Sequence, residues 1–266
     1  MNKTALITGA SSGIGAEFAR RLAATGHDLV LVARTEHKLK AMADELTARH
    51  RIRAEVVSQD LSAPDAADRV AGELTARGLT IDLLVNNAGF GTAGRFAQIA
   101  PGREHDELMV NIVALVDLTH ALLPGMLARG SGAVVNIGST AGFTISPYFA
   151  TYAASKTFVL NFGLALWSEL RGTGVKVLTV APGPVETPFF DVVGSKEAAI
   201  GAKMSTPEEV VTAALRALER DRGYVVPGRG NLAMAHLMPR RPRKLLAVIG
   251  RRVTRRVADA LTPVAQ

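Results

Sequence analysis

The regular alternation of short apolar segments with longer amphipathic ones constrains the fold of this chain more than any other feature. Along its 266 residues, short runs rich in Val, Ile and Leu recur at 4–8, 28–33, 54–59, 82–86, 133–138, 175–181 and 224–226. Segments of helical periodicity lie between them, at 13–25, 36–50, 65–77, 104–129, 151–171 and 207–220. Apolar runs of this length are typical of strands buried on both faces. The pattern therefore predicts an α/β fold, a doubly wound parallel sheet of about seven strands.

Composition excludes several classes of protein and site. The chain has no cysteine, which excludes disulfides, thiolate catalysis and cysteine-ligated metal, and we predict no metal site. Before the first glycine, the apolar run Ala5-Leu6-Ile7 is far shorter than a secretory signal requires. We also expect no spanning helix, because no stretch reaches the roughly 18 apolar residues that one needs. The expected location is cytoplasmic.

A loop rich in glycine follows the first predicted strand and opens the first predicted helix. It contains Gly9, Ser11, Ser12, Gly13, Ile14 and Gly15. Small residues are needed where backbone must approach a pyrophosphate and where the free N–H groups of a helix terminus point at it. A tight turn without a ligand is the alternative interpretation. The position of the loop after the first strand of a β-α-β pattern favours a bound dinucleotide.

The end of the second predicted strand indicates which dinucleotide is bound. A site that prefers NAD places Asp or Glu there, where the carboxylate holds the ribose 2′-hydroxyl. This chain has Ala33-Arg34 instead. A guanidinium suits a 2′-phosphate dianion, and the hydroxyls of Ser11 and Ser12 would add contacts. We therefore expect NADP(H) to be preferred over NAD(H); the alternative is that Arg34 merely lies solvated at the strand end.

Three polar residues are spaced for proton transfer. Tyr152 and Lys156 are four residues apart at the start of a predicted helix, so their side chains lie on one face. A phenol titrates near 10, and giving up its proton near neutrality requires its pKa to fall by about 3 units. We expect a lysine ammonium at about 4 Å in a semi-buried site to supply up to about that effect, with help from the positive charge of an oxidised nicotinamide. Ser139, at the end of the fifth predicted strand, is placed to hydrogen-bond a substrate oxygen.

These motifs occur in the order of a known family. Asn86-Asn87-Ala88-Gly89 follows the fourth predicted strand, Asn111 lies in the fourth predicted helix, and Pro182-Gly183 follows the sixth strand. Together with the glycine loop and the three proton-transfer residues, they make the chain resemble the short-chain dehydrogenase/reductase family over roughly residues 3 to 190. The resemblance implies a Rossmann-type domain that transfers hydride between a nicotinamide and a carbonyl or alcohol.

The resemblance also assigns roles to single residues. It implies that Tyr152 is the general acid and base, that Lys156 holds the nicotinamide ribose, and that Asn111 positions a water in the proton relay. The family's other cofactor contacts fall on Asp60, Leu61, Asn87, Ala88, Gly89, Pro182, Gly183, Val185 and Thr187. Considered alone, Tyr152 is explained equally well as a core residue, and Ser139 is explained equally well as a turn former. Asn111 reads as a buried amide bonded to backbone, and Asp60 as a helix cap.

The rest of the chain divides into a lid and an extension. We predict one catalytic domain over 1–230, a substrate lid within it at about 188–205, and a basic amphipathic extension over 231–266. The lid residues are mostly apolar: Phe189, Phe190, Val192, Val193, Ile200 and Met204. Further apolar side chains come from the loop before Tyr152, at Phe143, Ile145, Pro147, Tyr148 and Phe149. This composition predicts an apolar pocket and an apolar small-molecule substrate.

Positive charge gathers in the extension. The chain carries +7 in total, yet residues 223–266 hold nine basic residues against Asp259, which leaves −1 for residues 1–222. Apolar residues recur there at helical spacing, at Leu246, Ile249, Val253, Val257 and Leu261. We favour packing of this helix on its own protein or on a second subunit over contact with an anionic membrane surface. No nucleic acid partner is expected, because the extension has no aromatic residue after Tyr224.

The sequence therefore predicts an NADP(H)-dependent oxidoreductase. Apolar residues beyond one stripe in the 104–129 and 151–171 helices predict a homodimer or homotetramer. One alternative keeps the fold but uses NAD(H) to oxidise an alcohol, and Arg34 argues against it. Another is a cofactor-sensing protein without turnover, which the complete set of Asn111, Ser139, Tyr152 and Lys156 argues against.

Overall fold

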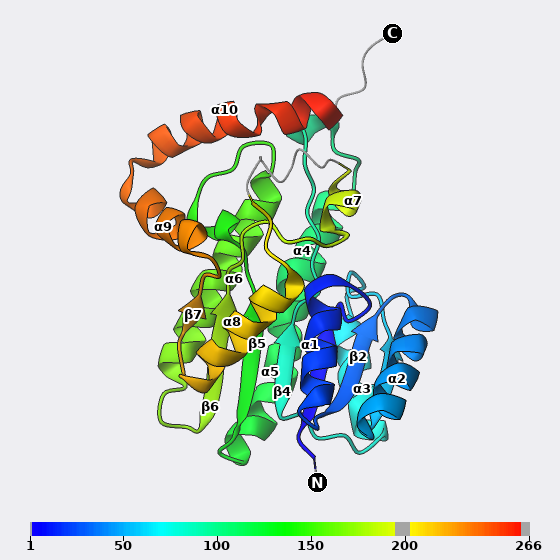
Figure 1. The fold of residues 1–266 in the computed structure, drawn as a ribbon. Helices are drawn as coiled ribbons and strands as arrows, with labels where there is room; N and C mark the ends of the chain where they lie inside the picture. The colour runs from blue at the N-terminus through cyan, green and yellow to red at the C-terminus, as the bar shows by residue number, and fades with distance from the viewer. Residues whose placement is uncertain (1, 195–202, 262–266) are drawn as a thin grey trace.

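A seven-stranded parallel sheet forms the middle of the computed structural model, which describes residues 2–194 and 203–261 (Figure 1). The strands are β1 (Thr4–Thr8), β2 (Asp28–Ala33), β3 (Ala54–Ser58), β4 (Leu83–Asn86), β5 (Gly132–Ile137), β6 (Val175–Val180) and β7 (Tyr224–Val225). Their order is β3-β2-β1-β4-β5-β6-β7, with every pair parallel. The predicted fold class is confirmed. The strand order reverses at β1 and β4, and ligands of such sheets bind beyond the carboxyl ends of those strands.

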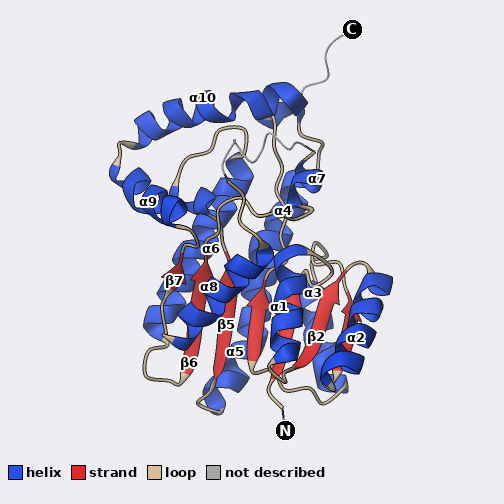
Figure 2. Ribbon diagram, in the orientation of Figure 1, coloured by secondary structure: helices blue, strands red, loops and turns tan. Residues whose placement is uncertain are grey.

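Helices cover both faces of the sheet (Figure 2). They are α1 (Gly13–Ala24), α2 (Glu36–His50), α3 (Ala66–Ala76), α4 (Arg103–Leu108), α5 (Ala114–Ala128), α6 (Ala150–Glu169), α7 (Phe189–Val193), α8 (Pro207–Glu219), α9 (Arg229–Leu237) and α10 (Arg243–Leu261). Side chains alternate along a strand, so the neighbours Leu6 and Ile7 of β1 enter different cores. Ile7 packs in the core under α1, α2 and α8, and Leu6 in the core under α3 and α5. This burial on both faces explains the continuous apolar runs of the strands.

A wider turn divides the helix that the sequence predicts over 104–129. After α4, the backbone forms a π-helical turn at Met109–Val113, and α5 follows directly. Asn111 lies buried inside this turn. Single π-helical turns insert one extra residue into an α-helix and occur frequently at functional sites. The sequence pattern predicts one continuous helix here and does not indicate the π-helical turn.

The continuous helical run Arg103–Ala128 is long and apolar enough to cross a membrane, judged by length and composition alone. This finding corrects the expectation that no stretch would qualify, which counted unbroken apolar residues and not mean hydropathy. The core helix of a soluble protein, which is mostly buried, passes the same test, but only 28% of the apolar window is buried here. Leu118 and Met126 of this run lie in the core against the sheet, which gives its apolar character a structural reason.

The chain after β7 forms α9 and α10, which lie with α7 beyond the carboxyl ends of the strands (Figure 2). α10 rests on the loop that leads into α6. The Thr254 hydroxyl donates to the Pro147 carbonyl oxygen at 2.7 Å, and Val257 is 1% exposed. At Gly250 the helix approaches so closely that an added Cβ would lie 2.5 Å from the Ile145 carbonyl oxygen. These contacts fasten α10 to its own chain.

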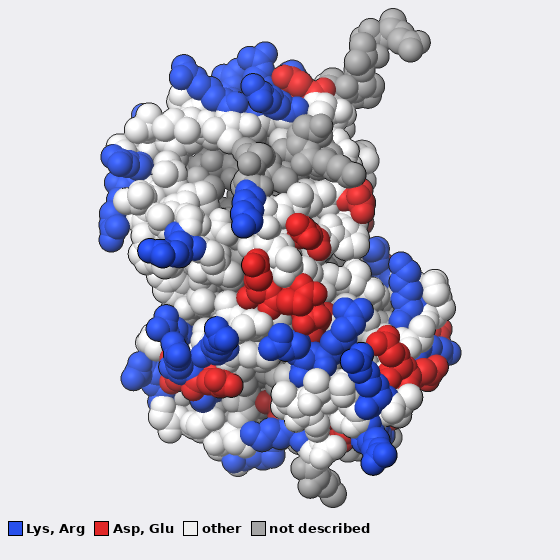
Figure 3. Space-filling model, viewed as in Figure 1, with Lys and Arg blue, Asp and Glu red and all other residues white. Residues whose placement is uncertain are grey.

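A second apolar row on α10 faces outward. Of the predicted stripe, Leu246 and Val257 are buried, but the residues between them are not. α10 turns only part of the predicted apolar stripe toward the loop below it. Ile249 and Val253, in the middle of the stripe, are exposed to solvent. The exposed row consists of Leu245, Val248, Ile249 and Val253, which are 46–56% exposed. Basic side chains gather over the same helix (Figure 3).

Alanine at Gly250 tests the packing of α10. In an open helix, alanine in place of glycine stabilises by about 1 kcal/mol. At Gly250 the new Cβ would meet the Ile145 carbonyl oxygen and the Pro147 ring, so we expect a net loss of roughly 1–3 kcal/mol. The control is Gly230→Ala in α9, where nothing lies within 4 Å of an added Cβ. Thermal unfolding should show a lower Tm for Gly250→Ala only; equal Tm values for the two variants would contradict the packing.

Candidate active site

The glycine loop between β1 and α1 is shaped for close approach of its backbone to a ligand. Gly9 and Gly13 take left-handed conformations, with φ of 64° and 56°. A Cβ on Gly9 would lie 2.9 Å from the Ala88 Cα, and one on Gly15 would collide with the Gly9 carbonyl. Ser12 is the N-cap of α1 but makes no side-chain hydrogen bond to the helix. The start of α1 thus has backbone N–H groups for an anion, which fits a pyrophosphate.

The side chains of the same loop differ in exposure. Ser11 is half-buried and Ser12 is exposed. Ile14 packs against the core under α1, so only its backbone is free to face a ligand.

One threonine fastens the end of β4 to the glycine loop. The Thr8 Oγ1 accepts the backbone N–H groups of Asn87 and Ala88 at 2.9 Å each, and donates to the Val85 carbonyl at 3.3 Å. The Asn87 amide returns two hydrogen bonds, to the carbonyls of Thr8 at 2.8 Å and Gly9 at 3.2 Å. The predicted cofactor residues of the two loops therefore form one continuous surface at the point where the strand order reverses.

Arg34 and Asp60 are neighbours at the ends of β2 and β3. Both are exposed. Burial acts to raise the pKa of Asp60, but hydrogen bonds from Ser62 and the charge of Arg34 outweigh it, and the pKa lies below its usual value. Asp60 Oδ1 accepts the Ser62 N–H at 3.0 Å and the Ser62 hydroxyl at 2.9 Å, so it caps a turn. The alternative interpretation of Asp60 as a helix cap is wrong, because the N-cap residue of α3 is Asp65. Leu61 is buried in the core.

Ser139, Tyr152 and Lys156 are brought together by β5 and α6. Ser139 follows β5, and its hydroxyl accepts the Ala141 N–H at 3.1 Å while also hydrogen-bonding Tyr152. Lys156 Nζ donates to the Ile137 carbonyl oxygen at 2.9 Å and lies 5.8 Å from the centre of the Tyr152 ring. Ser139 is therefore a turn former and a hydroxyl donor at once, since the turn fixes the side chain that faces the phenol.

Burial dominates the titration of this group. It raises the pKa of Tyr152 to about 12; the Ser139 hydrogen bond acts in the opposite direction and the Glu107 charge adds to the rise. Burial lowers the pKa of Lys156 to about 8, against the opposing effect of Glu107. The expectation that Lys156 depresses the phenol pKa is thus wrong for the protein alone. The ammonium is bonded to the Ile137 carbonyl, and the phenol carries its proton at neutral pH.

The amide of Asn111 is held by the Phe90 backbone and by the Ser155 hydroxyl. Its Oδ1 accepts the Phe90 N–H at 3.1 Å, and its Nδ2 donates to the Phe90 carbonyl at 2.9 Å and to the Ser155 hydroxyl at 3.1 Å. A Cβ on Gly89 would lie 2.9 Å from the same Oδ1 and 3.4 Å from Lys156 Nζ. Asn111 and Gly89 therefore adjoin the catalytic lysine, and the amide itself has the structural role of joining the turn to the loop after β4.

The loop after β6 closes the far side of the site. Thr187 reaches the start of α1, where a Cβ on Gly13 would lie 2.9 Å from the Thr187 methyl group. The Pro182 carbonyl accepts the Thr140 N–H at 2.9 Å, which ties this loop to the turn that begins at Ser139. Val185 is 7% exposed, so its backbone is the part that can meet a ligand.

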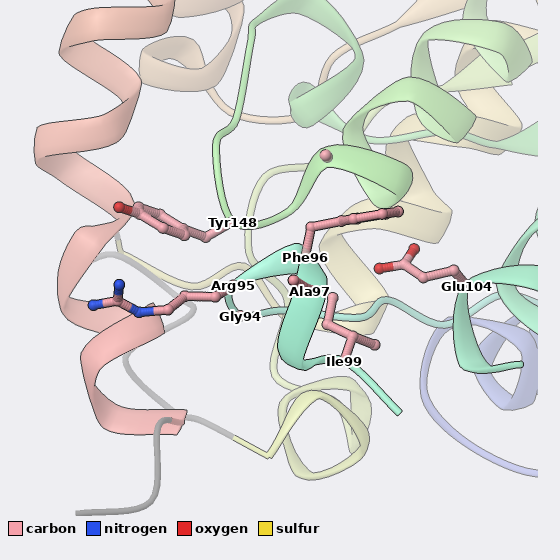
Figure 4. Close-up of a pocket in the computed structure, with 8 residues that line it drawn as sticks. Gly94, Arg95, Phe96, Ala97, Ile99, Glu104 and Tyr148 are labelled. Carbon is pink, nitrogen blue, oxygen red and sulfur yellow. The ribbon is translucent and has the colours of Figure 1, made fainter. Parts of the chain in front are cut away.

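Two cavities adjoin the site. The larger, of about 400 Å³, is lined by Gly94, Arg95, Phe96, Ala97, Ile99, Glu104, Tyr148 and Ala150 (Figure 4). The smaller, of about 210 Å³, runs from the loop at Gly91 to the ends of α7 and α10, where Val192, Val193, Ala258 and Leu261 line it. A Cβ on Gly91 would lie 3.0 Å from the Tyr152 ring, so the smaller cavity begins beside the phenol.

The apolar residues predicted to line one pocket are distributed over three places. Tyr148 lines the larger cavity, with a left-handed φ of 65° that is unusual for a bulky residue. Phe149 is buried in a cluster with Tyr152 and Phe189, whose ring centres lie 5.3 Å apart. Phe143 instead packs toward α9. Ile200 lies outside the described residues.

The sequence patterns gave no warning of several polar residues that build the site. Thr8 joins the two cofactor loops, and Asn231 of α9 packs on Gly183, where a Cβ would lie 2.6 Å from its amide. Ser155 links Asn111 to the Tyr152 carbonyl, to which it donates at 2.8 Å. Thr92 and Glu107 form a further hydrogen-bonded pair that the sequence patterns did not indicate. Glu107 is one of three acidic residues in the largely charged segment Arg103–Leu108, so the sequence gave no signal of its burial.

Comparison of the sequence with known proteins identifies relatives. The model of the short chain dehydrogenase family matches residues 3–198. Sulfoacetaldehyde reductase 2 of Chromohalobacter salexigens is 42% identical over 191 residues, which are 71% of this chain and 75% of that protein. A very-long-chain 3-oxoacyl-CoA reductase of Phaeosphaeria nodorum is 34% identical over 223 residues, 82% of this chain and 64% of the relative. The chain thus spans less than two thirds of that second protein.

Comparison of the structure gives the same family. A short-chain dehydrogenase from Sphingobium yanoikuyae, solved in complex with NADPH, superposes with a TM-score of 0.81 and 33% sequence identity. The match covers 99% of this chain and 98% of the other, so it includes α9 and α10.

Proposed function

The chain belongs to the short-chain dehydrogenase family and is an oxidoreductase for alcohol or carbonyl substrates, and from that premise we propose that it uses NADP(H) to reduce an apolar ketone or aldehyde, or to oxidise the corresponding alcohol. The observation that carries the proposal is the meeting of Ser139, Tyr152 and Lys156 beside the glycine loop. The backbone approach at Gly9 and Gly13 supports a bound dinucleotide next to them.

In this proposal Tyr152 moves the proton. With a pKa of about 12 the phenol is protonated at neutral pH, as a general acid for carbonyl reduction must be. Ser139 donates a second hydrogen bond to the substrate oxygen, and Lys156 places positive charge near the phenolate that forms. When bound, the nicotinamide supplies the hydride for reduction or accepts it in oxidation.

The proposed preference for NADP(H) rests on the exposed guanidinium of Arg34. It lies after β2 where an NAD-preferring site has a carboxylate, and Ser11 and Ser12 lie across the same loop. Planar guanidinium groups bind a phosphate through two parallel hydrogen bonds, which a ribose hydroxyl cannot match. The NADPH complex of the Sphingobium yanoikuyae relative supports this choice.

The proposed substrate is an apolar carbonyl compound. The smaller cavity has an apolar side formed by Val192, Val193 and Leu261 and a polar side that includes Arg95, Gln98 and Arg103, and Phe189 packs on the phenol ring of Tyr152. In this proposal the apolar side contacts an aliphatic or aromatic group of the substrate, and the polar side orients the rest of the molecule. Among the relatives, a reductase for very-long-chain 3-oxoacyl-CoA fits an apolar substrate better than one named for sulfoacetaldehyde.

We also propose that the protein is a homodimer or homotetramer that pairs α5 and α6 with a second copy. Phe158 and Leu127 are 39% and 37% exposed on these helices. Phe158 stacks on Phe162 at 5.7 Å, which makes a flat aromatic surface on α6. A helix that is apolar on more than one side buries the second side against another element.

For the outward row of α10 we propose contact with an anionic membrane surface. Leu245, Val248, Ile249 and Val253 are exposed beside a dense set of basic residues, with Asp259 as the one acidic residue between 223 and 266. Exposed apolar and basic side chains on one helix complement the acyl boundary and the headgroups of such a surface. A cytoplasmic protein with this peripheral contact stays our prediction for its location.

Phenylalanine at Tyr152 tests the chemistry. Tyr152→Phe keeps the ring and its packing on Phe189 but removes the proton donor, so turnover should fall by at least about 100-fold while NADPH binding survives. Lys156→Met should weaken both. The matched control is Tyr224→Phe, which removes a phenol that bonds His236 at 3.2 Å outside the site. Carbonyl reduction is followed by nicotinamide absorbance, and near-normal turnover of Tyr152→Phe would require a different acid.

Aspartate at Arg34 tests the cofactor preference. Arg34→Asp removes a phosphate partner and adds like-charge repulsion, together worth on the order of 2–4 kcal/mol, so NADH should become the tighter ligand. Arg49→Asp on α2 makes the same change of net charge elsewhere on the surface and should leave the preference as it is. Fluorescence titrations with both cofactors give the affinities. Equal affinity of the parent protein for NADPH and NADH would refute the assignment.

Two surface measurements test the remaining proposals. Light scattering at micromolar concentration should give a mass of two or four chains, and a monomer would rule out the α5–α6 pairing. Anionic vesicles should sediment the protein, with binding that weakens as salt rises. The double variant Ile249→Asp, Val253→Asp should abolish sedimentation without lowering Tm, because both residues lie on the exposed row. Unchanged sedimentation would show that this row is not the contact.

A further inference from the structure

Glu107 of α4 is fully buried, with 0% of its surface exposed. Its Oε2 accepts two hydrogen bonds from one residue, the Thr92 N–H and the Thr92 hydroxyl, both at 2.7 Å. Its Oε1 is buried without a hydrogen-bond partner among the described residues. A carboxylate in such a place loses its hydration and recovers only half of the hydrogen bonds that it could accept, so a purely structural role explains it poorly.

Glu107 holds a loop that packs against Tyr152 and Lys156. Within the segment 89–94, Gly89 lies against Lys156 Nζ and Gly91 lies against the Tyr152 ring. Thr92 joins this segment to α4 through the two hydrogen bonds to the glutamate. Glu107 therefore sits directly behind the backbone that Tyr152 and Lys156 face, and its charge acts on both of them through a short, water-poor path.

The ionisable groups around Glu107 are few. Within the described part of the chain, Glu104 on the same helix and Lys156 on α6 act on it, and Glu107 acts in turn on Tyr152. Burial raises the pKa of Glu107 to about 7, the Thr92 hydrogen bonds and Lys156 lower it, and Glu104 raises it. Glu104 itself lines the larger cavity, with its carboxylate directed toward the segment Phe96–Gln98 (Figure 4). The glutamate thus changes charge in the pH range where an enzyme works.

We propose that Glu107 is a positioning residue of the reaction: its carboxylate, seated between the loop after β4 and α6, sets the pH range over which the Tyr152–Lys156 pair exchanges protons. This inference rests on the proposed function, because it concerns the proton of the same phenol. The ionised glutamate favours the protonated phenol and the charged ammonium, and both effects have the same direction. As pH rises through neutrality Glu107 becomes charged, and Tyr152 then keeps its proton to higher pH.

The isosteric variant Glu107→Gln separates charge from packing. Its amide oxygen can accept both Thr92 hydrogen bonds, and only the negative charge is lost. Without that charge the phenol gives up its proton at lower pH. The pH at which kcat for reduction falls to half of its maximum, and the pH at which kcat for oxidation, which needs the phenolate, rises to half of its maximum, should therefore both move to lower pH. A packing defect would lower both reactions at every pH.

Two controls accompany the pH profiles. Glu17→Gln replaces another buried glutamate, 6% exposed, on α1 across the sheet, and should leave both profiles in place. Thr92→Val removes one hydrogen bond that favours the charged glutamate, so its profiles should move in the same direction as those of Glu107→Gln but less far. If Glu107→Gln does not fold, Thr92→Val carries the test.

A measurement without substrate keeps the inference distinct from the proposed function. In protein labelled with ¹³C at the glutamate carboxyl groups, NMR should show one resonance that titrates near neutrality and is absent from Glu107→Gln. In Lys156→Met that resonance should titrate at higher pH, because the positive charge that stabilises the carboxylate is gone. A resonance unmoved by Lys156→Met, or pH profiles of Glu107→Gln that keep their position, would overturn the inference. Absence of any carbonyl reduction by the parent protein would overturn the proposed function, and the NMR titration would still decide the role of Glu107.

Discussion

The hydroxyl of Thr8 is the contact on which the rest of the site depends. At the carboxyl edge of a parallel sheet the last backbone N–H groups have no strand partner, and a half-buried N–H that lacks a partner costs free energy. The Asn87 N–H also lies 3.0 Å from the Val85 carbonyl oxygen, whereas Thr8 reaches both N–H groups at once. Thr8 accepts both, from Asn87 and Ala88, and so holds the ends of β1 and β4 together. Only with that edge fixed can Gly9 and Gly15 pass close to the second loop without a collision. These two hydrogen bonds therefore fix both the surface predicted to hold the cofactor and the loop after β4, which packs against Lys156.

Burial has a larger effect than charge pairing on the pKa values of Tyr152 and Lys156. A phenol and an ammonium removed from water both shift toward their neutral forms, which moves the pKa of Tyr152 up and that of Lys156 down. The sequence suggested the opposite shift for the phenol, since spacing shows that the two side chains share a helix face but not how far both are withdrawn from solvent. The protein alone is thus set for proton donation. Any depression of the phenol pKa for the oxidation direction needs positive charge beyond that of Lys156.

The strands and the motifs that follow them could be predicted from the sequence because each depends on residues that are close together in the chain. Apolar runs bounded by glycine predict strands such as 4–8 and 28–33 to the residue, and the four-residue spacing of Tyr152 and Lys156 fixes a shared helix face. The π-helical turn at Asn111, the Thr92–Glu107 pair and the division of the α10 stripe could not be read. Each arises where segments distant in the chain meet, so the deciding neighbour is absent from any local window.

The contact of α10 with the loop before α6 has a consequence for the order in which the protein folds. Thr254 and Pro147 are 107 positions apart, so the roof over the substrate side closes a far longer loop than the neighbouring strand pairs do. Contacts of such separation form late, since their chain entropy is lost before the contact repays it. Thr8 joins the glycine loop to the loop after β4 across only 79 and 80 positions. We therefore expect these two loops to come together before α10 docks on the loop before α6.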